Sequence, residues 1–559
     1  MRKTRNQCCL PCGAFMSSTE TTPPPDNVDT VDSVTEPDSG RLDGASPLRL
    51  FSILIVVILF TEIAPLQYTM VAAALQKMTK TFPTVGGNIN WAVIILGVVG
   101  ASATPLVGKA SDIWGKKRLL LLCGLIFLVG AVIDATTTNW TLFLIGRGLS
   151  ALAIATQFIA YGLVRDLMPR KYVPIGIGMI GAGVGFSGAI APLVGGYLVD
   201  HFQWQAMFWF LAIYTVVLTP LVIFLVPESK IRVRERIDPI GAITLSAGVL
   251  FVLLYLDNGQ NWGWARPSSL AWLIGGLVLV AAFFAVESRI RQPIMDMKLL
   301  ANPKVSIVML MALVGMGITA VQPLALGYMT QTPGSDALRA NVVEGVVAQA
   351  HQKGANLPAA LVHVSLDPGY SYGSGFTMLG YAFHIALWVG VMAVIFGPIA
   401  GIVARRTGPR ISAIIAFTVL TVSGIGFAVF HYSWVTYLVL AMLGGIAFGF
   451  VNAALPNLIV EAVPPEQQGI STGMLGVTMS VGTGGAMAIT TALLNNNPVK
   501  AHIDVMGHQA VQVIPQVFAD RGYTESFWVV VGTTVAALVI ALLMRHGRQP
   551  ATGGARGKS

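Results

Sequence analysis

The sequence predicts an all-α integral membrane protein in which two six-helix bundles repeat, with two further helices inserted between them. Composition, apolar runs and an internal repeat support this prediction. Charged residues make up 11% of the 559 residues and hydrophobic residues 54%, whereas soluble domains carry about 25% charged residues. The mean hydropathy is +0.70. We therefore expect a lipid bilayer to be the solvent for most of the chain.

Fourteen apolar runs are each long enough, or nearly so, to cross about 30 Å of hydrocarbon as a helix. They lie near residues 51–75, 90–108, 119–137, 140–164, 174–198, 205–226, 239–256, 269–287, 305–328, 376–403, 411–430, 434–460, 470–493 and 525–545. With the N-terminus placed inside, 27 of the 35 Lys and Arg residues fall in inner tails and loops. This bias predicts that both termini are cytoplasmic. The net charge of +9 then reflects topology, and no nucleic-acid partner is expected.

The runs divide the chain into five predicted parts. These are a disordered cytoplasmic tail over 1–47, an N-terminal six-helix bundle over 48–230, an inserted helix pair over 231–300, a C-terminal six-helix bundle over 301–545 and a cytoplasmic tail over 546–559. The C-terminal bundle contains two long outer loops, near 331–374 and 494–523. Residues 341–350 could form a short amphipathic helix. It would cap the outer opening or bind a partner, or the loop is a solvated insertion without a specific role.

The four cysteines give little information about function. Cys123 lies in an apolar run and is interpreted as a packing residue. Cys8, Cys9 and Cys12 precede the first predicted helix; three thiols make an incomplete zinc site, and palmitoylation is the alternative. Met16 is an alternative start to Met1, which would remove these three cysteines.

Four landmarks recur in the same order at nearly one spacing. Gly108 and Gly115 recur 293 residues later as Gly401 and Gly408. The other pairs are Trp140 with Trp434, Pro169 with Pro464, and Gly178-Met179 with Gly473-Met474. The repeat indicates two homologous halves. Facing membrane repeats are an architecture of secondary transporters, which bind substrate near the midplane between them.

The repeated loop resembles a signature of the major facilitator superfamily. The segment Gly108–Arg118 is similar to that family's loop between helices 2 and 3, and Arg147 stands at the place of its helix-4 arginine. The fourteen-helix pattern, together with Asp238-Pro-Ile-Gly241, looks like the drug:proton antiporter branch. A helix-5 segment is similar to the glycine–proline motif of exporters in the superfamily, through Gly188, Pro192, Gly195 and Gly196.

Two departures from the antiporter branch bear on coupling. That branch usually has an Asp followed by Thr in helix 1, but this region reads Leu66-Gln67-Tyr68-Thr69, and the nearest acid is Glu62. Arg405 replaces the Asp in the second copy of the loop signature. The resemblance still implies that the first copy is a conformational latch, in which Asp112 pairs with charges or with a helix N-terminus across the halves. Its residues are Gly108, Asp112, Gly115, Lys116, Lys117 and Arg118.

Three ionisable residues are candidates for proton coupling. Glu62 lies near the middle of the first run, where a carboxyl group must be neutral, paired or in contact with water. Its alternative role is a structural hydrogen bond. Arg147 lies within the fourth run and would bind Glu62 or an anionic part of the substrate, or else extend to the outer interface. His384 is the third candidate, because imidazole titrates near neutral pH.

Several polar residues of the runs could line a substrate cavity, although each could equally form a hydrogen bond between helices. They are Gln67, Tyr68, Gln157, Tyr161, Gln322, Asn452 and Asn457. The glycine-rich helix 5 is interpreted as a surface on which the halves rock. No nucleotide-binding, metal or catalytic motif is found, so an enzyme is not expected, nor is a cofactor or a bound metal.

The preferred function is proton-coupled export of amphipathic or toxic compounds across the plasma (inner) membrane by a monomer. Its partners would be a small-molecule substrate and the lipid bilayer. A transporter of a dedicated metabolite or lipid is the main alternative. A sensor or scaffold that kept the fold without transport is a third possibility, and it should tolerate loss of Glu62 and Arg147.

Overall fold

The computed structural model describes residues 41–78, 81–82, 85, 91–232, 239–289, 301–352, 354 and 356–553. Most of the predicted tail over 1–47, including Cys8, Cys9 and Cys12, lies outside the described residues. Asp238 also lies outside them, as do residues 554–559 of the predicted tail over 546–559.

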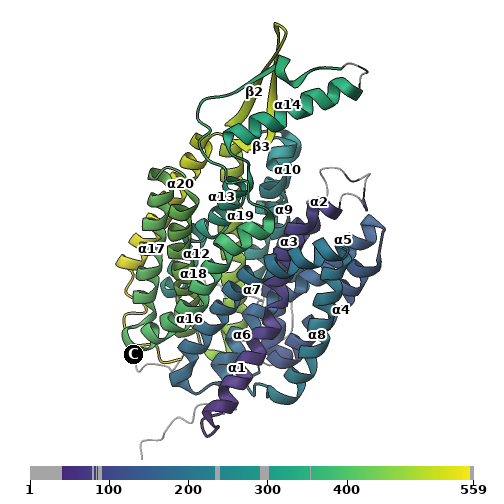
Figure 1. Ribbon diagram of the computed structural model, residues 1–559. Helices are drawn as coiled ribbons and strands as arrows, with labels where there is room; N and C mark the ends of the chain where they lie inside the picture. The colour runs from purple at the N-terminus through teal and green to yellow at the C-terminus, as the bar shows by residue number, and fades with distance from the viewer. Residues whose placement is uncertain are drawn as a thin grey trace, which may run out of the picture. The chain divides into compact units, whose positions relative to one another are not determined.

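The described part of the first half consists mainly of helices, drawn in purple and blue in Figure 1. They are α1 (Pro47–Thr61), α2 (Ile63–Met78), α3 (Trp91–Trp114), α4 (Lys116–Thr136), α5 (Trp140–Ser150), the turn η2 (Ala151–Ala153), α6 (Ile154–Leu167), the turn η3 (Arg170–Tyr172), α7 (Val173–His201) and α8 (Gln205–Leu225). The helices α9 (Pro239–Trp262) and α10 (Pro267–Glu287) follow as a packed pair.

The second half repeats this helical pattern and adds a small sheet. Its helices are α12 (Pro303–Gly315), α13 (Ile318–Gln331), α14 (Ser335–Gln352), the turn η4 (Ala359–Leu361), α15 (Met378–Tyr381), the π-turn η5 (Ala382–Ala386), α16 (Leu387–Thr407), α17 (Pro409–Val429), α18 (Trp434–Ala462), the turn η6 (Pro465–Gln467), α19 (Gln468–Asn495) and α20 (Asp520–Leu543). Its strands are β1 (Val362–Leu366), β2 (Pro498–Val505) and β3 (His508–Phe518).

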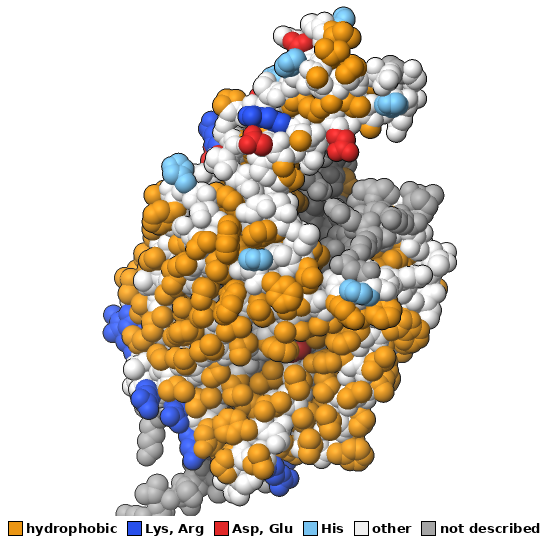
Figure 2. All heavy atoms as spheres, viewed as in Figure 1, with side chains coloured by type: hydrophobic (Ala, Val, Ile, Leu, Met, Phe, Trp, Pro, Cys, Tyr) orange, Lys and Arg blue, Asp and Glu red, His pale blue; other side chains and the backbone are white. Residues whose placement is uncertain are grey.

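Twelve helical segments of the described chain are long and apolar enough to cross a membrane. The helices α3 and α9, of 24 residues each, are outside that set. The predicted count of fourteen is therefore not confirmed. Figure 2 shows hydrophobic side chains covering the helical part, with a few Lys and Arg at one end and a larger group towards the end where the C-terminus lies in Figure 1. We call this the latch end and the opposite end the sheet end.

The repeated landmarks have the same local structure in both halves. Gly115 separates α3 from α4 with φ 106° and ψ 138°, and Gly408 separates α16 from α17 with φ 103° and ψ 147°. Only glycine adopts such a conformation readily. Trp140 begins α5, and Trp434 begins α18.

The halves meet along two seams of small residues, between α7 and α16 and between α3 and α19. A side chain at Gly178 would collide with the carbonyl of Gly397, and one at Gly185 would collide with Ala393. On the other seam, a Cβ at Gly108 would lie 2.5 Å from the carbonyl oxygen of Gly469. Close backbone approach is how helices pack when lipid removes the hydrophobic drive between them.

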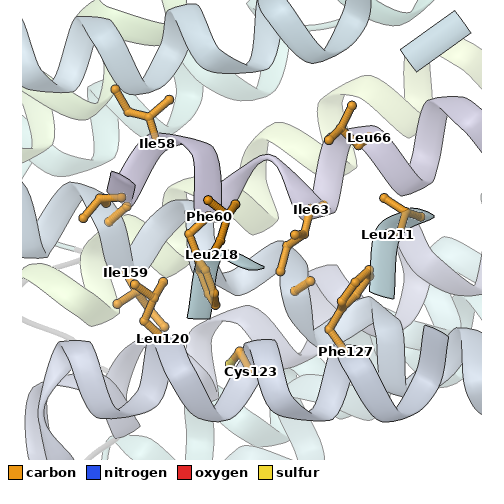
Figure 3. Close-up of a cluster of buried hydrophobic side chains, with 14 of the residues drawn as sticks. Ile58, Phe60, Ile63, Leu66, Leu120, Cys123, Phe127, Ile159, Leu211 and Leu218 are labelled. Atoms are coloured by element: carbon orange, nitrogen blue, oxygen red, sulfur yellow. The ribbon is translucent and has the colours of Figure 1, made fainter. Parts of the chain in front are cut away.

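The core of the first half is a cluster of buried apolar side chains (Figure 3). Phe60 of α1 reaches towards α4, where Gly124 leaves room for its ring. Cys123 lies in the same cluster and is 2% exposed. The interpretation of Cys123 as a packing residue agrees with this position.

The two long outer loops come together as one small domain, so the all-α prediction is wrong in this region. β1 from the first loop pairs antiparallel with β2 from the second, with Val362 opposite Val505, and β2 pairs with β3. Met506 and Gly507 both have positive φ and form the two-residue turn of the β2–β3 hairpin. This part of the structure stands above α13 and α19 in Figure 1.

The helix α14 covers this sheet and includes residues 341–350, where an amphipathic helix was considered. Its valines pack on the buried Val362, Ala501 and Ile503. The domain is tied to the second half through Tyr372, whose hydroxyl donates to the carbonyl of Phe518 (2.7 Å). We call α14 with β1–β3 the sheet domain.

Candidate functional site

Glu62 lies at the break between α1 and α2 and is fully buried. The break has a local cause: Pro65 has no N–H to donate to the carbonyl of Thr61, so the helix ladder is interrupted. The hydroxyl of Ser187 in α7 donates to one carboxyl oxygen of Glu62. The other oxygen, Oε1, has no hydrogen-bond partner in the described structure.

The neighbours of Glu62 belong to three further helices. Gly183 of α7 lies directly against the carboxyl group, where any side chain would collide with it. Tyr161 of α6 and Tyr214 of α8 lie within electrostatic range of Glu62, and Tyr214 donates to the carbonyl of Leu59 (2.7 Å). A buried acid with one unbonded oxygen can accept a proton or a ligand donor there at little structural cost.

Arg147 is also fully buried, but it pairs with a residue that the sequence analysis did not select. Its Nη1 lies 3.9 Å from Oδ2 of Asp134 in α4 and donates to Oε1 of Gln67 in α2 (3.3 Å). Its Nε donates to the carbonyl of Ala92 in α3 (2.8 Å). The ring of Phe208 in α8 lies 5.4 Å from the guanidinium carbon. The expected contact of Arg147 with Glu62 is therefore replaced by one with Asp134.

Aromatic side chains pack around Arg147 towards the sheet end. Phe143 lies one turn before Arg147, and its ring contacts Trp204 and Phe208 edge to face at 5.8 Å. Phe82 and Trp140 complete the group. We call these five residues the aromatic cover. Arg147 does not extend to the interface, because its side chain is 0% exposed beneath this group.

His384 lies apart from Glu62 and Arg147. It is an exposed residue of η5, its Nδ1 lies 2.8 Å from the carbonyl oxygen of Gly380, and its ring stacks on Phe376. Trp434 contacts the same ring edge to face. The structure thus places His384 in an aromatic setting on the second half, away from the buried acids of the first half.

The candidate latch is a compact group of charges at the latch end. Lys116 is fully buried, and its Nζ lies 3.1 Å from Oδ1 of Asp112 and 2.9 Å from Oδ2 of Asp166 in α6. The hydroxyl of Ser229 also donates to Asp166 (2.6 Å). Because one ammonium serves two buried carboxylates, removing it would leave two charges without a counterion.

The remaining latch residues cap the start of α4. Glu228, which follows α8, accepts hydrogen bonds from the backbone N–H groups of Lys117 (2.9 Å) and Arg118 (3.1 Å). A carboxylate at a helix N-terminus is favourable because the unpaired N–H groups and the helix dipole attract it. Gly115 leaves the space that this carboxylate occupies.

Two contacts connect the latch, in the first half, to residues of the second half. The carboxylate of Asp112 accepts a hydrogen bond from the backbone N–H of Gly469, in the first turn of α19. Arg165 of α6, the residue after the predicted run over 140–164, is buried and donates to the side chain of Gln468 and to the carbonyl of Val463 (3.0 Å). Both contacts hold the latch end closed at the α3–α19 seam.

The C-terminal tail also lies against the latch end. His546 Nε2 lies 2.8 Å from the carbonyl oxygen of Leu458, and Glu461 of α18 accepts from the backbone N–H groups of Thr552 (2.8 Å) and Gly553 (2.7 Å). These contacts order the tail along the second half as far as residue 553. No motif in the sequence indicates them.

The residues of the predicted helix-5 motif lie in α7 and have different surroundings. A Cβ added at Gly195 would lie 3.3 Å from Met70 of α2, and one added at Gly196 would lie 4.0 Å from Leu379. Gly188 faces open space, and Pro192 lies inside α7. The tight contacts with α16 come instead from other glycines of the same helix, Gly178 and Gly185 among them.

The predicted cavity residues fall into two groups. Gln67, Gln322 and Asn452 are buried and bonded: Gln67 donates to the carbonyl of Ser150 (2.9 Å), Gln322 to that of Ala441 (3.4 Å) and Asn452 to that of Phe448 (3.0 Å).

Tyr68 and Gln157 form the second group. Tyr68 is 43% exposed. Both amide atoms of Gln157 are buried without a hydrogen bond of good geometry, and its neighbour is Tyr161. Asn457, which was also predicted to line the cavity, donates across the halves to the carbonyl of Pro174 (3.4 Å). Gln157 and Tyr161 therefore remain the better candidates for contact with a ligand.

The sequence does contain a signal for Asp134. Like Glu62, it is a charged residue inside an apolar run, and such residues are candidates for function. Asp166 and Glu228 lie where the runs end, so sequence alone does not separate them from ordinary surface charges. Among the described residues, no group of three or more His, Cys, Asp or Glu side chains is arranged to hold a metal ion.

Comparison with known proteins gives one family. The model of the Major Facilitator Superfamily matches residues 57–343 and 355–559. The uncharacterized MFS-type transporter YfiU of Bacillus subtilis is 24% identical over 479 residues, covering 83% of this chain and 81% of YfiU. The uncharacterized MFS-type transporter YvkA of the same species is 28% identical over 261 residues, 45% of this chain. This chain spans 56% of the length of YvkA.

Two relatives have names that describe an activity. The MFS-type efflux pump MMF1 of Pseudozyma antarctica is 28% identical over 48% of this chain and 52% of MMF1. Multidrug resistance protein 3 of Bacillus subtilis is 26% identical over 42% of this chain and 46% of its own length.

Solved structures give the same fold at low sequence identity. The proton:xylose symporter XylE superposes with a TM-score of 0.57 and 13% identity, covering 90% of this chain and 98% of XylE. The human organic anion transporter MFSD10 gives a TM-score of 0.55 and 14% identity, covering 89% of this chain and 100% of its own. The chain is therefore a multi-pass membrane protein of the major facilitator superfamily, a family of transporters and not of enzymes.

Proposed function

We propose that the protein is a proton-coupled exporter of amphipathic compounds that works by alternating access. The observation that carries this proposal is Glu62, a fully buried carboxyl group at a helix break with one oxygen left unbonded. Such a group can bind a proton or a cationic substrate but not both at full strength, because each neutralises the charge that attracts the other. Competition of this kind is the simplest basis for antiport.

The setting of Glu62 supports a role in the transport cycle. Ser187, its hydrogen-bond donor, belongs to α7, and α7 forms one of the two seams between the halves. A movement of α7 against α16 would therefore change the surroundings of the carboxyl group. Gln157 and Tyr161, on the neighbouring α6, supply polar atoms near the same place.

Export is the favoured direction for two reasons. The names of MMF1 and multidrug resistance protein 3 describe efflux and drug resistance in those relatives. The helix-5 segment of this chain is similar to the exporter motif. We also propose fourteen membrane helices, because α3 and α9 are 24 residues long and would add to the twelve segments already counted.

The proposed setting is the plasma membrane, with the latch end cytoplasmic and the protein working as a monomer. The gathering of Lys and Arg at the latch end supports this orientation. No cofactor is required, since the proton gradient would supply the energy. The sheet domain would then lie on the outer side.

The test measures proton movement in proteoliposomes when ethidium, a lipophilic cation, is added. We expect the wild-type protein to move protons against ethidium and the Glu62→Gln variant to lose this coupling. Glu344→Gln is the matched control, because Glu344 is an exposed residue of α14. If a broad panel of amphipathic compounds moves no protons with the wild-type protein, the proposal fails and a dedicated metabolite or lipid becomes the substrate to seek.

A further inference from the structure

We infer that Asp134 is a second proton-carrying residue of the transport cycle and that Arg147 responds to its charge. This inference rests on the proposed proton-coupled transport. It adds to that function a carboxyl group on α4, separate from Glu62 at the α1–α2 break. Three features of the Asp134–Arg147 pair support it: the geometry of the pair, its connection to α2 and its position beneath the aromatic cover.

The ion pair is buried but loose. Asp134 and Arg147 are both 0% exposed, and Nη1 of Arg147 lies 3.9 Å from Oδ2 of Asp134. A structural arginine–carboxylate pair is usually bidentate, with nitrogen–oxygen distances of about 2.7–2.9 Å. Ser150 is a nearby neutral donor, but neither carboxyl oxygen accepts a hydrogen bond of good geometry within the described residues. The structure thus does little to hold Asp134 in its charged form.

The surroundings fit a carboxyl group that faces α5. Gly146 of α5 leaves the space for Oδ1 of Asp134, and any side chain there would collide with it. Gly130, one turn earlier in α4, packs against the backbone of Gly146 in the same way. Within the described part of the chain, Arg147 is the charged group that contacts Asp134.

Arg147 connects this carboxyl group to the helix that follows Glu62. The same Nη1 that approaches Asp134 donates to Gln67 of α2, and Gln67 lies five residues after Glu62. When Asp134 is charged, the guanidinium is shared between α4 and α2. When Asp134 takes up a proton, the attraction to α4 is lost and Arg147 keeps its bonds to Gln67 and to the carbonyl of Ala92. Protonation therefore changes how firmly α2 and α3 are held to α4.

The pair also has a short route to water. Asp134 lies two residues before the end of α4 at the sheet end. The aromatic cover, which includes Phe143 and Phe208, separates Arg147 from that end. Displacement of the cover would let a proton from water bind a carboxyl oxygen of Asp134. The same O–H bond breaks when the pair re-forms after the halves open at the latch end, and the proton passes to water on that side, so no other reactant is needed.

The test uses two assays on the same proteoliposomes. The first measures proton movement driven by ethidium, and the second measures exchange of labelled for unlabelled ethidium, which needs no net proton transfer. We expect Asp134→Asn to lose the first and keep the second. Asp134→Glu should restore part of the proton movement. Asp336→Asn is the control, because the Asp336 side chain is 94% exposed.

The outcomes separate this inference from the proposed function. If the wild-type protein moves protons and Asp134→Asn moves them equally well, the inference is wrong and the proposed function stands. Loss of both assays together with a lower melting temperature would assign Asp134 a structural role, which also overturns the inference. If the wild-type protein moves no protons at all, the proposed function itself fails.

A wild-type measurement covers the case in which the variant does not fold. Dicyclohexylcarbodiimide modifies protonated carboxyl groups in apolar surroundings, and mass spectrometry locates the modified residue. We expect labelling of Asp134 that increases as the pH falls and decreases when ethidium is present. An Asp134 that is never labelled while Glu62 is would refute the inference.

Discussion

Gly108→Ala should loosen the closed latch end more than any other single methyl group on α3. The Cβ of this alanine would lie 2.5 Å from the carbonyl oxygen of Gly469, whereas ordinary contacts begin at 3.4 Å. The seam must therefore widen by about 0.9 Å. The obstacle is backbone in the first turn of α19, so no side chain can rotate away. The same carbonyl belongs to the residue whose N–H binds Asp112.

The size of the effect follows from the cost of overpacking. Inserting a methyl group into a well-packed contact costs about 1–3 kcal/mol. If that cost applies only while the seam is closed, the equilibrium constant for opening the latch end increases about 5- to 150-fold. The open state has no such cost, because the two glycines are then apart.

The assay is the labelling rate of a cysteine that the closed seam hides. Thr472 is fully buried, and its hydroxyl lies 3.4 Å from the carbonyl oxygen of Phe158 in α6. Thr472→Cys, in a background without the four native cysteines, should react with a maleimide only when the latch end opens. The labelling rate then follows the population of the open state.

Gly97→Ala is the matched control, because Gly97 also belongs to α3 and a Cβ there meets nothing within 4 Å. It should leave the labelling rate unchanged. Equal rates in Gly108→Ala, Gly97→Ala and the parent would refute the idea that close packing at Gly108 keeps this end closed.

Three further predictions concern the latch end. Lys116→Met should lower the free energy of unfolding by about 3–5 kcal/mol, because it leaves two buried carboxylates unpaired; Lys117→Met should have a much smaller effect, and melting in detergent compares them. Glu461→Gln should speed hydrogen exchange in residues 545–553 by weakening charge-assisted bonds of about 1.5–3 kcal/mol, with Glu344→Gln, at an exposed residue of α14, as control. Burial is the main cause that lowers the pKa of His546, so the docked tail binds fewer protons than the free one. Docking should be full above the ordinary pKa of about 6.5 and weaken as the pH falls below it, and His546→Gln should remove this pH dependence of exchange.

The sequence predicted the helical segments well because membrane helices are specified by long apolar runs, which local composition reveals. It also predicted Glu62 and Arg147 as buried charges, since a bilayer makes such residues rare. The partner of Arg147 could not be predicted from spacing, because Asp134 comes from a different helix and the pairing depends on how α4 and α5 pack through Gly130 and Gly146.

The sheet domain was missed for a different reason. Residues 362–366 and 498–518 alternate apolar and polar side chains, and Met506-Gly507 is a turn signal between two such stretches. The pairing of β1 with β2, however, joins segments more than 130 residues apart. Nothing in either loop alone indicates that contact. Both segments were therefore predicted only as long outer loops, although both carried strand patterns.

The two copies of the loop signature close the latch end by different means. In the first copy, Asp112 binds the N-terminus of α19 and Lys116 links it to Asp166. In the second copy, Arg405 has no carboxylate to offer the N-terminus of α7. The C-terminal tail occupies that place instead.

The tail contacts follow the symmetry of the repeat. Ala551 donates to the carbonyl of Ala404 at the end of α16 (3.0 Å), and Gly553 packs against Arg170 and Val173 where α7 begins. Glu461, which holds the tail, stands 295 residues after Asp166, the same spacing that relates Pro169 to Pro464. One seam is thus closed by a carboxylate within the loop signature and the other by a segment from the end of the described chain. Loss of the tail should therefore weaken the α7–α16 seam at the latch end while leaving the α3–α19 seam intact.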